Sequence, residues 1–295
     1  MREPDCQIPG LSPGICVATL QETTVLRPAG WVEILVMPVF IGTSGWQYAD
    51  WRGRFYPPGL AQSRWLEHYA ARFQTVEVNN SFYRLPEVGT FQRWRDITPD
   101  DFVVGIKASR YLSHVRRLKE PDEAVHRLME RAQHLGKKLG PILVQLPANF
   151  QIDLGALDEV LTTVPRGVRV AFEPRHQSWF VEATAELLSH HNAAFCLSDS
   201  HRRRVPLWRT TSWGYLRFHG GRARPAPCYG RTALRSWAER LASQWSAEED
   251  IYVFFNNDHG GCAVRDARRF SLAIRREGLE PTRVPTARES TLSRN

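Results

Sequence analysis

The feature that most constrains the fold of this chain is an alternation of short apolar runs with longer amphipathic segments, which repeats eight times. The apolar runs have the length and composition of buried strands, and the segments between them have helical periodicity. In segment 63–73, for example, apolar residues recur at i, i+1, i+4 and i+8 from Trp65, as in a helix that covers a sheet. The expected strands are 39–43, 75–79, 102–107, 142–146, 168–173, 194–198, 214–218 and 251–256, and the expected helices are 63–73, 90–95, 122–139, 154–163, 184–192, 232–245 and 263–277.

Strands that alternate with helices in this way predict a parallel sheet. Eight strands within about 240 residues favour an α/β fold of the (β/α)8 TIM-barrel-like type, formed by one domain over residues 37–278. No GxGxxG or P-loop motif follows any expected strand, so the sequence carries no nucleotide-cofactor motif.

The two ends of the chain differ from this pattern. Residues 1–36 contain four prolines and two cysteines without sustained periodicity, which predicts a poorly ordered extension or a start-site error with Met37 as the true initiator. Residues 279–295 are polar and contain proline, which predicts a frayed tail.

Charge and cysteine content limit the functional classes. The chain has 39 Lys+Arg against 31 Asp+Glu, a net charge of +8 and a pI near 9.5, which favours phosphate-bearing partners. Its five cysteines include no CxxC pair, which disfavours a structural zinc site, and their odd number disfavours a closed disulfide framework. No apolar stretch is long enough to cross a bilayer. We therefore expect a soluble cytoplasmic protein that has no membrane partner.

Strand alternation predicts which side chains point into the barrel. In strand 75–79, Val76 and Val78 suit the helix-facing side, so Glu77 and Asn79 are expected to point inward. Asp199 follows the sixth strand on the parity of Phe195 and Leu197, and it is also expected to point inward. The remaining expected inward residues are Lys107, Gln145, Glu173, Tyr215, Arg217 and His219, with Asn256 and Asn257 at the end of the last strand.

These polar residues lie at the carboxyl ends of their strands, where barrel enzymes carry their active sites. The expected catalytic residues are Glu77, Glu173, His219 and Lys107. Glu77 and Glu173 are paired carboxylates, one with a pKa raised by burial and the other kept ionised by Lys107 or Arg217, and His219 is expected as a proton relay. The expected ligand-binding residues are Trp46, Asn79, Gln145, Arg175, His176, Arg217, Asn256 and Asn257. Arginine suits bidentate binding of a carboxylate or phosphate.

Other interpretations of the same residues remain open. Glu77 with Lys107, and Glu173 with Arg217, are also expected as ion pairs that merely close the barrel mouth. A divalent metal is a further alternative, with Glu173, Asp199 and His219 as its candidate ligands. Several cations in the cluster, and only one inward histidine, count against that metal site.

Several motifs resemble those of the YecE-like family, known as domain of unknown function 72. They are Ile41-Gly42-Thr43-Ser44-Gly45-Trp46, Glu77-Val78-Asn79-Asn80-Ser81-Phe82-Tyr83-Arg84, Gly140-Pro141-Ile142-Leu143-Val144-Gln145-Leu146-Pro147, Phe172-Glu173-Pro174-Arg175-His176, Arg217-Phe218-His219-Gly220 and Phe254-Phe255-Asn256-Asn257. The resemblance covers about residues 39–277 and implies a barrel fold, but no established activity. The family's recurrent polar positions coincide with inward residues derived above, and they also include Arg175 and His176.

The sequence therefore predicts an enzyme that uses acid–base chemistry, with or without a divalent metal, on a small polar or phosphorylated ligand. The alternative from another class is a non-catalytic protein that binds nucleic acid or nucleotides through basic loops such as 201–204 and 222–224. A sensor or scaffold site is a third interpretation.

Overall fold

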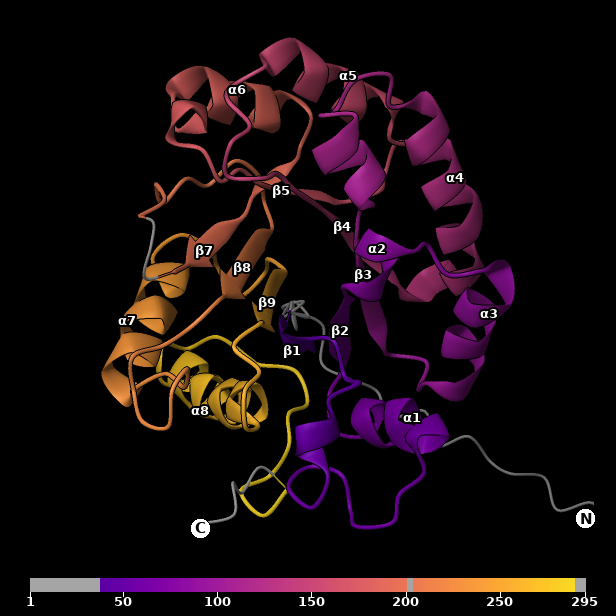
Figure 1. The fold of residues 1–295 in the computed structure, drawn as a ribbon. Helices are drawn as coiled ribbons and strands as arrows, with labels where there is room; N and C mark the ends of the chain where they lie inside the picture. Colours follow the sequence, from indigo (N-terminus) through magenta and orange to yellow (C-terminus); the bar gives the residue numbers. More distant parts are fainter. Residues whose placement is uncertain (1–37, 201–203, 290–295) are drawn as a thin grey trace, which may run out of the picture. The chain divides into compact units, whose positions relative to one another are not determined.

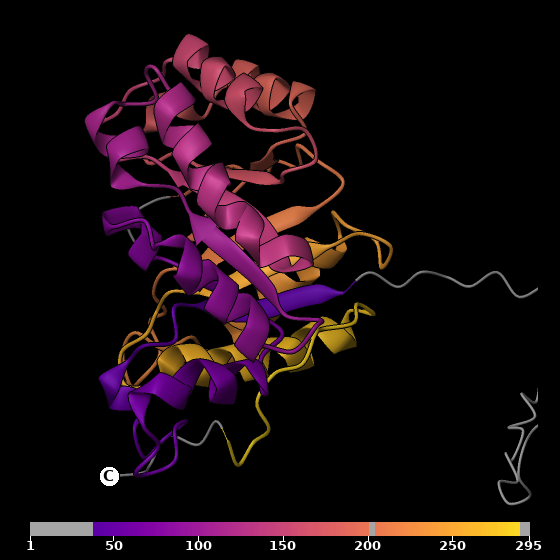
Figure 2. The ribbon, with the colours of Figure 1, turned by 90° about the vertical axis from the view of Figure 1, so that its right-hand side faces the viewer.

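In the computed structural model, which describes residues 38–200 and 204–289, parallel strands form a ring and the helices lie around it (Figure 1). The view in Figure 2, turned by 90°, shows helices flanking the strands along their length. The strands are β1 (Val39–Ser44), β2 (Thr75–Val78), β3 (Val103–Lys107), β4 (Leu139–Gln145), β5 (Val170–Glu173), β6 (Ala194–Phe195), β7 (Leu197–Asp199), β8 (Gly214–Phe218) and β9 (Ile251–Phe255).

The sheet closes on itself through one interrupted strand. Its order is β6-β5-β4-β3-β2-β1-β9-β8-β7, so β6 and β7 stand at its two ends. Only Cys196 separates these two pieces in the chain, and its backbone N–H donates to Phe172 of β5 at 2.9 Å. The nine strands are thus the eight that the sequence predicts, with the sixth divided in two, and the predicted TIM-barrel-like fold is confirmed.

The helices agree with the predicted positions, with differences at their ends. They are α1 (Trp65–Ala70), α2 (Asn80–Tyr83), α3 (Val88–Ile97), α4 (Asp122–Ala132), α5 (Leu154–Thr163), α6 (Glu182–His190), α7 (Arg231–Ala242) and α8 (Cys262–Arg276). The predicted helix 122–139 stops early because Gly136 adopts a φ of 57°, and β4 then begins at Leu139 rather than at residue 142. The sequence did not predict α2 or the π-helix Tyr111–Val115, which follow β2 and β3.

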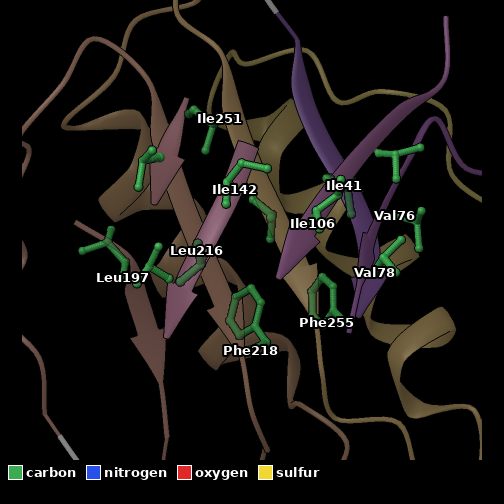
Figure 3. Packing of buried hydrophobic residues seen from close by; sticks show 14 of the residues in the cluster. Ile41, Val76, Val78, Ile106, Ile142, Leu197, Leu216, Phe218, Ile251 and Phe255 are labelled. Atoms are coloured by element: carbon green, nitrogen blue, oxygen red, sulfur yellow. The ribbon is translucent and has the colours of Figure 1, made fainter. Parts of the chain in front are cut away.

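Two apolar layers position the site. Residues such as Ile41, Val76 and Leu216 point outward from the strands and pack against the helices (Figure 3). A second cluster fills the inside of the ring at its amino end, where Phe40 stacks on Tyr252 with ring centroids 4.8 Å apart. The barrel interior is therefore apolar at that end, and its polar inward residues are confined to the carboxyl ends of the strands.

The described part of the C-terminal segment is held against the barrel, so the prediction of a frayed tail is wrong for residues 279–289. Val39 donates to Glu280 and accepts from Thr282, at 2.8 and 2.9 Å. Further along, Arg283 forms an ion pair with Asp101 at 2.9 Å. The end segments 1–37 and 290–295 lie outside the described residues, and the whole predicted extension 1–36 lies outside them as well.

Two of the cysteines form a disulfide, although the odd number of cysteines disfavoured a closed disulfide framework. Cys228 and Cys262 form a disulfide with their Cα atoms 4.9 Å apart, which joins the loop after β8 to the first turn of α8. Cys196 is free and buried. No helix in the described ranges combines the length and apolar character needed to cross a membrane.

Candidate active site

The guanidinium of Arg217 is the centre of the polar cluster. It projects inward from β8 and its side chain is 1% exposed. One terminal nitrogen donates to Glu77 Oε1 on β2 and the other to Glu173 Oε2 on β5, each at 2.7 Å. Because these three strands are not neighbours in the sheet, Arg217 links opposite sides of the barrel through its interior.

Glu77 is fully enclosed by donors. Besides Arg217, it accepts hydrogen bonds from the Ser44 hydroxyl at 2.7 Å and from the Tyr215 hydroxyl at 2.5 Å. Burial raises the pKa of Glu77, but Arg217 and the two hydroxyl donors outweigh burial and leave that pKa below its ordinary value. Glu77 is therefore an ionised counter-charge without solvent access, which suits a positioning role better than proton transfer.

Glu173 gathers the remaining polar side chains. It accepts from Gln145 Nε2 at 2.7 Å, and His219 Nε2 lies 3.0 Å from its other oxygen. Burial raises the pKa of Glu173, while Arg217 and His219 pull it well below the ordinary range. The expectation that burial raises the pKa of one carboxylate is thus wrong, because a single guanidinium serves both.

His219 stands between the buried carboxylates and solvent, with 15% of its side chain exposed. Its Nδ1 lies 3.2 Å from the amide nitrogen of Asn256, a group that only donates. With the amide assigned in this way, Nδ1 accepts, and the ring proton sits on Nε2 and points at Glu173. Both nitrogens of a neutral His219 are therefore satisfied, as a proton relay requires.

Lys107 occupies the opposite margin of the same network. Its ammonium donates to Gln145 Oε1 at 2.8 Å and lies 4.1 Å from the ring centre of Phe82 on α2. The expected Glu77–Lys107 ion pair is absent from the described residues, since Arg217 occupies that carboxylate. Burial, followed by repulsion from Arg217, lowers the pKa of Lys107 to about 8.

Two further predicted residues present unsatisfied polar atoms at the site. Arg175 lies 3.6 Å from Glu173 and is 31% exposed, and its buried Nε has no hydrogen-bond partner. Asn79 has a buried, unpartnered Oδ1 and borders a small cavity together with Trp46 and Tyr48. Such atoms are rare in folded proteins and mark places where a ligand or water completes the bonding.

Three predicted residues have other surroundings. His176 caps the short helix Gln177–Trp179 by accepting from the Ser178 backbone at 3.2 Å. Asn257 faces the helices, where it donates to Asp266 of α8 at 2.9 Å. Asp199 pairs in register with Phe218, which belongs to the helix-facing cluster, so parity places Asp199 on the outer face.

The candidate metal ligands are consequently not assembled. Glu173 and His219 lie side by side, but Asp199 is on the other face of its strand. Over residues 38–200 and 204–289, no group of three His, Cys, Asp or Glu side chains is placed to hold a metal ion.

Sequence reasoning missed several contributors. Ser44 lies two residues beyond Gly42 on β1, so strand parity was a usable signal for it. Tyr215 was recognised as inward but not as a partner of Glu77. Phe82 gave no signal, because the helix that carries it is only four residues long.

Comparison with known proteins identifies relatives of the same architecture. The model of a family described as "Protein of unknown function DUF72" matches residues 40–289. The chain is 32% identical over 149 residues to UPF0759 protein YecE of Escherichia coli (strain K12), a match that spans 50% of this chain and 52% of that protein. It is 23% identical over 286 residues to UPF0759 protein YunF of Bacillus subtilis (strain 168), which covers 83% and 99% of the two chains.

Solved structures give the same result for the fold. The crystal structure of a DUF72 family protein from Thermotoga maritima MSB8 superimposes with a TM-score of 0.70 at 28% identity, covering 81% of this chain and 99% of that one. A DUF72 family protein from Enterococcus faecalis V583 gives a TM-score of 0.66 at 20% identity, covering 81% and 98%.

Proposed function

We propose that this chain, which belongs to the DUF72 family, is an enzyme that transfers protons on a small ligand carrying a phosphate or carboxylate. The proposed catalytic residues are Lys107 and His219, and Arg175 is the proposed anchor for the anionic group. Glu77, Glu173 and Arg217 are assigned as positioning residues rather than as the acid–base pair.

The observation that carries the proposal is the gradation of burial along one hydrogen-bonded network. The side chains of Glu77, Glu173 and Arg217 are 0–1% exposed, and the single positive charge of Arg217 lies between the two negative charges of the carboxylates. His219 and Lys107 border this centre, and each contacts it through one hydrogen-bonding partner, Glu173 or Gln145. Preorganised acid–base catalysis needs titratable groups that are held in place by a rigid charged centre, and this network has that arrangement.

The charge of the accessible groups favours an anionic ligand. The guanidinium of Arg175 is 31% exposed; its Nε lies 3.6 Å from Glu173 Oε1, beyond hydrogen-bond distance, whereas Arg217 and Gln145 donate to Oε2 of the same carboxylate. Arginine binds phosphate and carboxylate oxygens through its fork of N–H donors. An anionic ligand supplies the acceptor that this arginine lacks.

Ligand binding and proton transfer are tested separately. We expect phosphorylated sugars or small hydroxy- and keto-acids to raise the melting temperature of the full chain, because they bind only the folded state. We expect Arg175→Gln to abolish this shift, and Arg235→Gln on the outer face of α7 to preserve it. Oligonucleotide stabilisation that survives Arg175→Gln would instead support the nucleic-acid alternative.

Proton transfer is detected by incubating the stabilising ligand with the enzyme in D2O and following loss of its C–H signals by NMR. His219→Asn should slow the exchange by about 10²–10⁴-fold, the usual contribution of a general acid or base. His191→Asn is a matched control, since that ring is 16% exposed and also pairs with a carboxylate, on Asp158. Equal exchange in both variants would refute the assignment of His219.

A further inference from the structure

We infer that Lys107 is a nucleophile that forms an imine with a ligand aldehyde or ketone, so that the substrates of this site are small carbonyl compounds bearing a phosphate or carboxylate. This inference deepens the proposed function and depends on the ligand site described there. It rests on the placement of the amine, the surface around it and the partly exposed guanidinium of Arg175.

The amine is held in place without being neutralised by a carboxylate. Lys107 Nζ donates to the amide oxygen of Gln145 at 2.8 Å, and Gln145 in turn donates to Glu173 at 2.7 Å. Over the described residues, no carboxylate forms an ion pair with Lys107, because Arg217 engages both nearby ones. An amide acceptor orients the nitrogen and leaves it free to lose its proton.

One side of the amine is covered by aromatic rings. Phe82 lies beneath it at 4.1 Å, and His114 packs edge-on against Phe82 with ring centroids 4.9 Å apart. Burial, then Lys107 itself, lowers the pKa of His114 to about 4, which keeps this ring neutral near pH 7. Burial and Arg217 lower the pKa of Lys107 to about 8, so a large share of the amine is uncharged under mildly alkaline conditions.

The reaction is balanced without any oxidant or reductant. The nitrogen lone pair of Lys107 attacks the carbonyl carbon, and the C–N bond forms while the carbonyl oxygen takes a proton. That oxygen leaves as water after it accepts a second proton, the C=N bond replaces the C=O bond, and the nitrogen gives up two protons in place of the two that the oxygen gains. His219 is available to carry these protons, since Glu173 and Gln145 link it to Lys107.

The composition of the chain makes this inference simple to test. It contains four lysines, Lys107, Lys119, Lys137 and Lys138. Lys138 is buried against the carbonyls of Arg95 and Thr98, so the competing exposed lysines are Lys119 and Lys137. The α-amino group of the chain also forms imines, and its adduct is recognised because it falls on a different peptide. At pH 8 about half of an amine of pKa about 8 is neutral, roughly a hundredfold more than for an ordinary lysine.

The experiment is reductive trapping. The full chain is treated with sodium borohydride in the presence of pyruvate, dihydroxyacetone phosphate or glyceraldehyde 3-phosphate, and the adducts are located by peptide mass spectrometry. We expect one adduct per chain at Lys107, formed at least tenfold faster than at Lys119, given the difference in neutral fraction. The adduct should disappear in Lys107→Arg and persist in Lys119→Arg.

The outcomes separate this inference from the proposed function. If these probes stabilise the wild-type protein through Arg175 but leave Lys107 unmodified, the imine is refuted and the anionic site stands. If no probe stabilises the protein and Lys107 reacts no faster than Lys119, both are refuted. The ratio of adduct formation at Lys107 to that at Lys119 in the wild-type protein tests the imine even if Lys107→Arg does not fold.

Discussion

Replacing Arg217 by methionine tests whether one guanidinium stabilises both buried carboxylates. The substitution keeps much of the apolar volume but leaves Glu77 and Glu173, at 0% and 1% exposure, without their counter-charge. Breaking one buried ion pair by removing a partner costs about 3–5 kcal/mol, and here a single change breaks two. We therefore expect Arg217→Met to lower the free energy of unfolding by at least about 4 kcal/mol at pH 8, a large part of the stability of a typical domain.

The pH dependence distinguishes lost charge balance from lost packing. In the wild type the pKa values of both carboxylates are lowered, so their stabilisation is present above their unfolded pKa values and is lost only as the pH falls through the folded ones. In Arg217→Met, burial without a counter-charge raises both pKa values, and the carboxylates become protonated at mildly acidic pH. The difference in stability between wild type and variant should therefore shrink from pH 8 to pH 5.

Urea unfolding followed by tryptophan fluorescence measures this difference at both pH values, and the ten tryptophans supply the signal. The matched control is the triple variant Arg217→Met, Glu77→Gln, Glu173→Gln, in which no buried charge is left unpaired. We expect it to recover most of the lost stability. A loss below about 1 kcal/mol, or an equal loss at pH 8 and pH 5, would refute the reasoning.

Three other regions give predictions that unfolding measurements check. Lys107 has a folded-state pKa of about 8, below its pKa in the unfolded chain. The free energy of unfolding of wild type should therefore rise by about 2–3 kcal/mol relative to that of Lys107→Met between pH 7 and pH 10. A constant difference between the two proteins would contradict the lowered pKa. Burial raises the pKa of Asp258 to about 7, and the folded chain therefore binds the proton more tightly. The free energy of unfolding of wild type should fall by roughly 2–4 kcal/mol relative to that of Asp258→Asn as the pH rises from 4 to 7. Parallel pH profiles of the two proteins would contradict the raised pKa of Asp258. Replacing Cys228 and Cys262 together by serine should lower stability by about 2–4 kcal/mol, because the disulfide closes a separation of 34 residues; unchanged urea midpoints would show that the bridge does not constrain the unfolded chain.

Strand parity explains why much of the site was predictable. Side chains alternate strictly within a regular strand, so Glu77, Lys107 and Arg217 follow directly from their apolar neighbours. The same rule should have placed Asp199 on the outer face. Phe195 and Leu197 point to the same side of the strand as Asp199, and both are large apolar residues that face the helices. Asn257 lies one residue too far for the inner face, which ends at Asn256.

Other properties depend on contacts between distant parts of the chain. The directions of the two carboxylate pKa shifts follow from the shared contact with Arg217, which no local pattern records. The Cys228–Cys262 bridge joins residues 34 positions apart without a recognisable spacing. Phe82, which lies beneath Lys107, is carried by a helix shorter than two turns, where periodicity cannot be detected.

The neighbours of β1 have a consequence for the order in which the fold is completed. One side of β1 pairs with β9, and the other side is shared between β2 and residues 280–282. During synthesis, the first strand thus emerges from the ribosome long before most of its partners, with exposed edges that are prone to intermolecular pairing. The barrel can close only after β9 and residues 280–282 have been translated, so the edges of β1 that they cover stay unpaired until then.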